Sequence, residues 1–259
     1  MKSFSTSVKV LLLSGLFISQ AFNARSQYTV NGSAAANGDD CYILTQFVGN
    51  QCGSVWYANL ITLAEDFDMT FQVYLGSYDN DGADGIAFVM QPTSTALGIA
   101  GGGLGYLGIS PSIAVEYDTW QNDDPWYDHI SVQRNGDVNY SGAVAGPVQA
   151  SATSFNIEDN QWHTTRITWD AETFTLAVYF DNALRLSYTN DIVTNTYSGN
   201  PAVYWGFTGS TGGAANVQQF CITSVTFGEY HEVPLSPWIF ALSILVILGV
   251  TILRLRKSL

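Results

Sequence analysis

The stretch VEYDTWQNDDPWYDHI runs from Val115 to Ile130 and holds five carboxylates, one asparagine and one histidine. The whole chain is only 12% charged, so these acids are unusually concentrated. Just before them, apolar residues at 113, 115 and 117 alternate with Ala114, Glu116 and Asp118. A period of two predicts an extended strand that buries one set of side chains and directs both carboxylates to the opposite face.

The residues after the loop extend the same pattern. Ile130 and Val132 resume an apolar face, while His129 and Ser131 take the other. Two carboxylates at strand spacing repel each other unless they are protonated or bridged by a cation. Carboxylate and amide oxygens suit calcium, and an added imidazole suits manganese or another transition ion. The stretch therefore predicts a metal site, and the alternative is a solvated acidic turn.

The start of the chain is typical of a secretory signal peptide. Residues 1–26 begin with Lys2 and Lys9, continue through the apolar run VLLLSGLFI, and reach Ala24 and Ser26 at the positions where a signal peptidase requires small residues. We therefore expect residues 1–26 to be removed and the folded part to lie outside the cell.

The end of the chain predicts a membrane anchor. Residues 238–253 are almost wholly apolar, a Pro-containing spacer at 231–237 precedes them, and a basic tail at 254–259 follows. This predicts a single transmembrane helix with a cytoplasmic C-terminus. The alternative for this segment is a buried core helix. The spacer, short span and basic end also resemble bacterial surface-sorting tails, which a sorting enzyme cleaves.

The region between the two terminal segments is strongly acidic. It holds all 22 acids of the chain against three arginines and no lysine, a formal charge of −19. Such a surface repels phosphate backbones and anionic head groups, which excludes nucleic acid as a partner.

Three cysteines fall in the exported region, where a disulfide is permissible. Cys41 and Cys52 would close a short loop, and this is the pairing we expect first. Cys221 lies in a strand-like segment as a small core residue or as the partner of one of the others.

The middle of the chain predicts strands throughout and no amphipathic helix of useful length. Its segments are short, rich in β-branched and aromatic residues, and separated by Gly, Asn, Asp and Pro. About two hundred residues of this kind predict one antiparallel sandwich or barrel. The expected strands cover residues 68–76, 85–91, 112–120, 129–136, 162–170, 174–182, 184–190, 202–209 and 221–229.

Three glycine-containing segments stand out besides the acidic stretch. GADGIAFV places Asp84 immediately before a predicted strand. GGGLGYLG exposes bare backbone that a ligand can approach closely, and WGFTGSTGG ends a strand in a loop of hydroxyls and backbone donors.

Together and in this order, these four motifs resemble the L-type (legume-type) lectin domain, particularly its bacterial members, over residues 27–230. The resemblance implies a concanavalin A-like jelly-roll sandwich of two large antiparallel sheets. It also implies a carbohydrate site that loops build over a paired calcium and manganese-type site, in which the metals are structural.

The resemblance implies a ligand set within the acidic stretch. Glu116 and His129 would bind the manganese-type ion, and Asp118 and Asp124 would bridge both ions. Asp124 fits the bridging position because Pro125 follows it and the histidine lies five residues further on.

Asn122 and the carbonyl of Trp120 would complete the calcium site. Here the chain departs from the family pattern, because the interval from Asn122 to the bridging aspartate is shorter than usual by one or more residues. Asp123 or Asp128 could therefore replace Asp124 as the ligand, and the calcium loop could be distorted.

The sugar-binding residues carry over in the same way. Asp84 matches the aspartate that accepts hydrogen bonds from adjacent sugar hydroxyls, and the family's preceding peptide bond, here Ala83 to Asp84, is cis. Gly102 matches the glycine whose backbone N–H reaches the sugar, with Gly103 as the alternative. Asn122 would contact both calcium and sugar.

Two further parts of the sugar site are implied. Trp120 or Trp126 would offer an aromatic face to a pyranose. Thr208 to Gly212 would form the loop that selects among sugars, with Gly209, Ser210 and Thr211 as its contact residues.

Two alternatives come from other functional classes. A glycoside hydrolase on the same type of jelly roll needs two carboxylates flanking the scissile bond. The second acid is missing, because Trp120 and Gln121 stand where it should be. A metal-stiffened adhesive or structural surface domain without sugar binding is the other alternative, and the shortened loop favours it.

Overall fold

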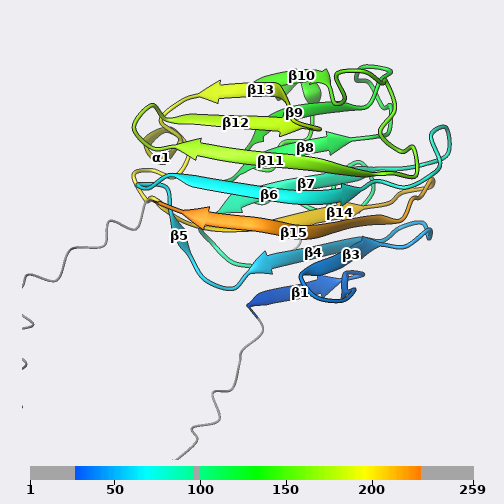
Figure 1. Ribbon diagram of the computed structural model, residues 1–259, viewed down its shortest axis with the longest axis horizontal. Helices are drawn as coiled ribbons and strands as arrows, with labels where there is room; N and C mark the ends of the chain where they lie inside the picture. The colour runs from blue at the N-terminus through cyan, green and yellow to red at the C-terminus, as the bar shows by residue number, and fades with distance from the viewer. Residues whose placement is uncertain (1–26, 96–97, 99, 229–259) are drawn as a thin grey trace, which may run out of the picture.

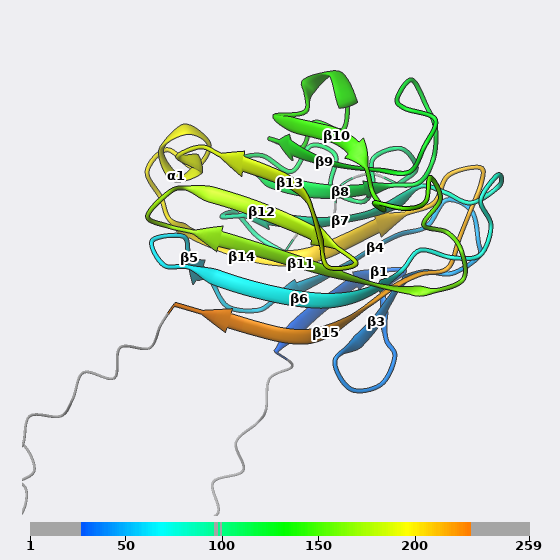
Figure 2. The same ribbon diagram turned by 45° about the horizontal axis from the view of Figure 1, so that its top comes forward.

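The computed structural model describes residues 27–95, 98 and 100–228, which form two stacked antiparallel β-sheets (Figures 1 and 2). The eight-stranded sheet has the order β1-β4-β14-β7-β8-β9-β10, with β5 beside β14. The seven-stranded sheet has the order β13-β12-β11-β6-β15-β3-β2. The predicted all-β antiparallel sandwich is therefore confirmed.

The strands of the eight-stranded sheet are β1 (Tyr28–Gly32), β4 (Cys52–Tyr57), β5 (Ile61–Thr62), β7 (Gly85–Gln91), β8 (Ile113–Asp118), β9 (His129–Arg134), β10 (Ala145–Gln149) and β14 (Ala202–Ser210). Those of the seven-stranded sheet are β2 (Ala35–Ala36), β3 (Cys41–Thr45), β6 (Phe67–Tyr74), β11 (Trp162–Asp170), β12 (Thr175–Phe180), β13 (Ala183–Thr189) and β15 (Gln218–Phe227). A 3-10 turn, η1 (Tyr140–Gly142), and a short helix, α1 (Ile192–Asn195), complete the described elements.

The main core lies between the two sheets. Along β6 and β11 buried residues alternate with more exposed ones, as expected for strands with one face on the core. Phe71 of β6, Phe207 of β14 and Phe220 of β15 meet there with ring centroids 4.5 to 6.4 Å apart. Ile113, Val115 and Tyr117 of β8 point into the same core, as their alternation predicts.

A second, smaller core covers the outer face of the eight-stranded sheet. Every residue of β7 and β8 is buried, because Leu104, Tyr106 and Ile109 of the glycine-rich segment pack over that face against Trp56. Glu116 and Asp118 lie on this outer face, opposite the main core. Both carboxylates are consequently buried, although they point away from the space between the sheets.

The pairing of the cysteines differs from our first expectation. The disulfide joins Cys41 to Cys221, which are register partners on β3 and β15. Cys52 is a free, half-buried thiol at the start of β4. Cys41 and Cys52 are close in sequence, but they lie on β3 and β4, which belong to different sheets. They are therefore not a disulfide pair.

Several elements had no sequence prediction. Strands β1, β3, β4 and β10 fell outside the expected set, as did α1, which Asp191 caps by accepting from the Thr194 N–H. Within the described residues, no helix is long and apolar enough to cross a membrane. The predicted signal peptide at 1–26 and the predicted span at 238–253 both lie outside the described residues.

Candidate functional site

Three potential metal ligands meet where β8 ends and β9 begins. Asp118 is the last residue of β8, His129 is the first of β9, and the two are register partners. Asp124 comes from the intervening loop, and one ligand atom from each residue lies within 4.8 Å of the others. The short loop thus returns a third ligand to the two strand ends.

The choice among the three loop aspartates follows from their surroundings. Asp124 Oδ1 accepts from the Asn122 N–H at 3.2 Å, which turns the loop back on itself. Asp128 is buried and turned toward another segment, where its Oδ2 accepts from the Ile157 N–H at 2.6 Å. Asp123 is exposed. The structure therefore places Asp124, and neither alternative, with Asp118 and His129.

The electrostatics of this cluster favour an added positive charge. Burial, followed by the charges of Glu116 and Asp124, raises the pKa of Asp118 well above its usual value. Burial lowers the pKa of His129, so its ring is held neutral, and its Nδ1 lies 3.3 Å from the Tyr127 carbonyl. Nε2 is then left for a ligand. A bound cation would offset both the cost of burying these carboxylates and the repulsion between them.

Glu116 is less accessible than the predicted ligand set implies. Its carboxylate accepts from the Tyr106 hydroxyl at 2.5 Å, the Ser131 hydroxyl at 2.7 Å and the Gln133 amide at 3.1 Å. Burial raises the pKa of Glu116 to about 7. It is not one of the three residues whose ligand atoms converge, so its metal role stays a prediction.

The residues that hold Glu116 were not found from the sequence. Ser131 and Gln133 lie on the same face of β9 as His129, so the alternation could have indicated both of them. Tyr106 arrives from the segment that covers the sheet, and nothing local in the sequence indicates its contact.

Trp120 and Asn122 follow Asp118 into the loop. The Trp120 N–H donates to Asp118 Oδ1 at 3.0 Å, and Asn122 Nδ2 lies 3.4 Å from the Trp120 carbonyl. A Cβ added at Gly102 would lie 3.7 Å from Asn122 Nδ2. A cavity of about 480 Å³ is lined by Gly102, Asp118, Asn122 and Asp124 among others, so the predicted glycine and amide do share one opening.

Asp84 comes immediately before β7, and its carbonyl accepts from the Thr119 N–H at 3.2 Å. Its peptide bond with Ala83 is cis, as the resemblance implied. The side chain is 5% exposed, its Oδ2 has no hydrogen-bond partner, and burial raises its pKa to about 6. A Cβ on Gly212 would lie 3.5 Å from both this Oδ2 and the Gly101 Cα. The carboxylate thus sits between two bare stretches of backbone with an acceptor unused.

The prediction for the third loop is wrong in part. Gly209 and Ser210 belong to β14, Thr208 and Ser210 are fully buried, and so is Thr211. Ser210 Oγ donates to the Gly101 carbonyl at 2.5 Å, and Thr211 Oγ1 donates to the Val48 carbonyl at 2.7 Å. These side chains hold neighbouring loops and are not available to a ligand. The strand simply continues further than its sequence suggested, which leaves Gly212 and Gly213 as the open backbone.

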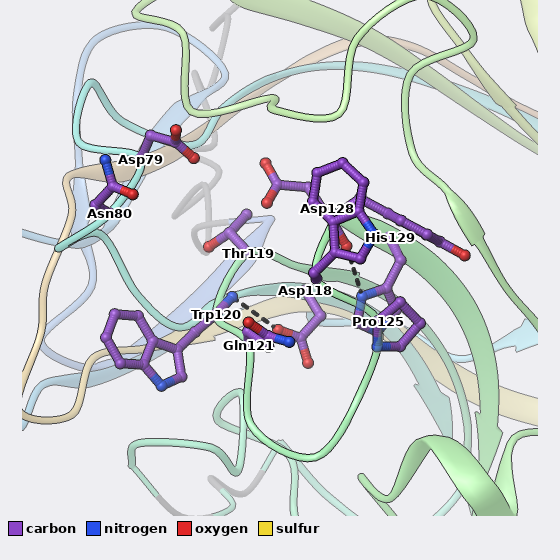
Figure 3. A pocket seen from close by; sticks show the side chains of 11 residues that line it. Asp79, Asn80, Asp118, Thr119, Trp120, Gln121, Pro125, Asp128 and His129 are labelled. Carbon is purple, nitrogen blue, oxygen red and sulfur yellow. Dashed lines mark hydrogen bonds between the residues drawn. The ribbon is translucent and has the colours of Figure 1, made fainter.

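Trp126 lies in a different opening from Gly102. It is 64% exposed, contacts Phe155 in a tilted arrangement with ring centroids 4.6 Å apart, and lines a cavity of about 320 Å³. Figure 3 shows Asp79 and Asn80 facing Asp128 and His129 across this cavity, with Thr119 and Trp120 between them. Trp120 lines the same cavity as Trp126, and neither lines the one beside Gly102. Only Trp120 bonds to Asp118, through its N–H, so it is the better candidate for stacking.

The sequence matches the family described as Legume lectin beta-barrel domain over residues 19–224. Agglutinin-2 of Cladrastis kentukea is 32% identical over 192 residues, which are 68% of this chain and 61% of that protein. The chain spans less than two thirds of the length of the curated relatives that it matches.

Solved structures share the fold. The metal-free lectin I-B4 of Griffonia simplicifolia superposes with a TM-score of 0.65 at 23% identity, over 81% of this chain and 95% of that one. A Bauhinia forficata lectin in complex with GalNAc gives a TM-score of 0.64 at 22% identity, over 80% and 93%. With the family match covering most of the chain, the conclusion is that this protein belongs to the legume lectin domain family.

Proposed function

We propose that this protein is a lectin that binds glycans at the β8 end of the sandwich through a site ordered by calcium and a manganese-type ion. The observation that carries the proposal is the convergence of a three-ligand cluster, a glycine beside Asn122, and Asp84 with an unused acceptor. Membership of a family of carbohydrate-binding proteins supports the same assignment.

The donor set fits the implied cations. Asp118 and Asp124 offer hard carboxylate oxygens, His129 offers one imidazole nitrogen, and Asn122 and the Trp120 carbonyl offer neutral oxygens beside them. This combination suits one oxygen-ligated and one mixed site. When bound, the cations would neutralise the buried carboxylates and fix the loop from 119 to 128, and they would not activate water.

The chain's own groups would bind the sugar. Asp84 is ionised at neutral pH, so its free Oδ2 accepts from sugar hydroxyls. The Gly102 N–H and the Asn122 amide donate to sugar oxygens from the neighbouring loops, and Trp120 packs against the C–H face of the ring. Each contact is shallow, so binding should be weak for one site and strong for many sites on a surface.

We further propose that the lectin domain is exported and held at a membrane or cell surface by the segment at 238–253. Support comes only from the sequence patterns at the two ends. Hydrolysis is disfavoured because Trp120 and Gln121 stand where a second catalytic acid would be needed. The adhesive domain without sugar binding remains the second candidate, supported by the short loop between Asn122 and Asp124.

A glycan array tests the proposal. The full-length protein, loaded with calcium and manganese, should bind a defined set of glycans. Asp84→Asn should lose about 10- to 100-fold in affinity, because hydrogen bonds to a charged acceptor contribute about 1.5–3 kcal/mol. Asp81→Asn is the matched control, since Asp81 is exposed in the same segment. Absence of any glycan binding by cation-loaded protein would favour the adhesive domain instead.

A further inference from the structure

Two buried polar side chains outside the proposed ligand set join the two halves of the proposed site. Asn216 follows β14 and Glu158 lies between β10 and β11, and each is 1% exposed. Asn216 Nδ2 donates to Glu158 Oε1 at 2.6 Å. Segments far apart in the sequence therefore meet in a buried hydrogen bond, where losing a partner is costly.

Asn216 holds the segment that leads to Asp84. Its Nδ2 also donates to the Tyr78 carbonyl at 2.9 Å, and its Oδ1 accepts from the Ser77 N–H at 3.2 Å. A Cβ at Gly76 or Gly82 would come within 2.3 Å of the Asn216 side chain, so this backbone wraps tightly around the amide. The segment from 77 to 82 then runs directly into the cis peptide before Asp84.

Glu158 connects the same amide to the metal loop. The neighbouring Ile157 N–H donates to Asp128 Oδ2 at 2.6 Å, and the Asp128 N–H donates to the Phe155 carbonyl at 2.9 Å. Asp128 immediately precedes His129, the predicted ligand at the start of β9. The Thr119 N–H already bonds the metal loop to the Asp84 carbonyl at 3.2 Å. A second path therefore runs from the ligand cluster through residues 155–158 to Asn216 and on to the segment from 77 to 82.

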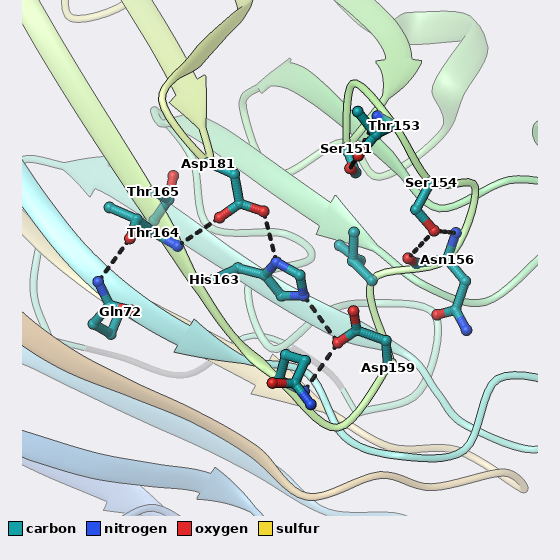
Figure 4. Close-up of polar contacts among 12 residues, drawn as sticks. Gln72, Ser151, Thr153, Ser154, Asn156, Asp159, His163, Thr164, Thr165 and Asp181 are labelled. Carbon is teal, nitrogen blue, oxygen red and sulfur yellow. Dashed lines mark hydrogen bonds and ion pairs between the residues drawn. The ribbon is translucent and has the colours of Figure 1, made fainter.

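The segment that carries Glu158 is itself well anchored. Figure 4 shows His163 of β11 between two carboxylates, with ring nitrogens 2.8 Å from Asp181 Oδ2 and 3.1 Å from Asp159 Oδ1. The Gln149 side-chain amide of β10 donates to the Ser154 carbonyl at 2.7 Å. Residues 154–159 are thus fixed to the sandwich, and they can transmit the position of the metal loop to Asn216.

We propose that Asn216 and Glu158 are positioning residues that hold the Asp84 segment in register with the metal loop, so that ordering one half of the site orders the other. This inference rests on the proposed function, because that function assigns the roles of Asp84 and the metal loop. It names a route through the chain's own side chains that requires no direct contact between Asp84 and a cation.

Amide hydrogen exchange on the full-length chain tests the route without needing to know the sugar. In metal-free buffer, Asn216→Ala should speed exchange in residues 77–84 by about tenfold or more, because two side-chain bonds to that backbone and the bond to Glu158 are lost. Asn31→Ala is the matched control, since Asn31 holds the Thr95 carbonyl of another loop at 3.2 Å. Unchanged exchange at 77–84 would overturn the proposal.

Added Ca²⁺ supplies the second readout. In the wild-type chain it should slow exchange at both 119–129 and 77–84. In Asn216→Ala the slowing should persist at 119–129 and at Asp84, whose carbonyl bonds to the Thr119 N–H, and be lost at 77–82. Equal slowing of 77–84 in both proteins would show that the coupling bypasses Asn216 and would overturn the route. If Ca²⁺ leaves 119–129 unchanged in the wild-type chain, the metal-ordered site fails, while the metal-free comparison still decides the positioning role.

Two substitutions at Glu158 test the proposal independently, in case Asn216→Ala does not fold. Burial raises the pKa of Glu158 to about 9, so a neutral side chain of the same shape should be accepted. Glu158→Gln keeps an acceptor oxygen for Asn216 and should exchange like the wild type at 77–84. Glu158→Ala removes that acceptor and should raise exchange there. Equal behaviour of the two variants would contradict a positioning role for Glu158.

Discussion

The pKa values of carboxylates are shifted in opposite directions at the two ends of the sandwich. At the end where β8 finishes, burial raises the pKa of Asp84 to about 6 and those of Glu116 and Asp128 to about 7. At the opposite end, near α1 in Figure 1, the Thr194 N–H lowers the pKa of Asp191, and the Thr173 N–H does the same for Asp170.

The difference lies in what surrounds each set of acids, and it agrees with a binding site at the β8 end. Acids at the α1 end are ionised and meet donors that the chain itself provides. Among the described residues, the acids at the β8 end have no arginine beside them. Arg166 bonds to Asp68, Arg185 bonds to the Gln149 carbonyl, and Arg134 pairs with Ile113 at the far end of β8. Uncompensated buried charge is costly unless a cation or a proton arrives, so the proposed cations would stabilise the β8 end.

Removing one ligand should separate the two ends most sharply. Asp118→Asn is expected to weaken cation binding by about 100-fold or more, since even outer-shell partners of a metal cost about 10- to 100-fold. The metal-free protein should not lose stability, because a buried charge is removed. Titration calorimetry with Ca²⁺ and thermal unfolding in chelator measure both effects. Asp68→Asn at the other end is the control, and unaltered cation affinity in Asp118→Asn would contradict the ligand assignment.

Cation affinity should fall steeply with acid. Because burial raises the pKa values of Asp118 and Asp124, protons compete with cations at a higher pH than for exposed carboxylates. Each proton that must leave weakens binding by about tenfold per pH unit below its pKa. Calorimetry at pH 7 and pH 5 should therefore show a loss of at least tenfold. Equal affinities at the two pH values would rule out proton competition.

The stability of the metal-free protein should also depend on pH in an unusual direction. Glu116 and Asp128 have folded-state pKa values of about 7, above their unfolded values, so the folded state binds protons more tightly. Their stabilisation is complete at low pH and is lost as pH rises through 7. Each group contributes about 2 kcal/mol, so we expect the free energy of unfolding in chelator to be lower at pH 8 than at pH 5.5 by about 4 kcal/mol. A higher value at pH 8 would show that these groups are not buried as described.

The smallest expected effect concerns the second cavity. Trp126→Ala should change the affinity for a single sugar unit by less than about 0.5 kcal/mol, because the ring is exposed and lies outside the Gly102 cavity. Trp120→Ala, which alters the loop next to Asp118, should cost more. Calorimetry with the best monosaccharide from the array compares them, and a reversed ranking would make Trp126, and not Trp120, the residue that packs against the sugar.

The predictions from sequence succeeded where a local pattern fixes the geometry. Alternation in β8 identified both faces of that strand, and the spacing to Pro125 and His129 favoured the aspartate that the structure brings to the cluster. They failed where partners come from distant segments. The Cys41 to Cys221 bridge depends on sheet order, and the role of Asn216 depends on a loop 138 residues away in sequence. The Ser210 prediction failed because nothing local shows that β14 continues through it.

Reversible removal of cations tests the central claim most directly. Full-length protein loaded with calcium and manganese should be retained on its best array glycan, released by chelator, and retained again when both cations are restored. Its midpoint of thermal unfolding should fall on chelation and recover when the cations are restored. The corresponding change in the free energy of unfolding is about 2.7 kcal/mol when the cation is present at 100 times its dissociation constant. Glycan retention that is unchanged by complete chelation would contradict a site ordered by cations.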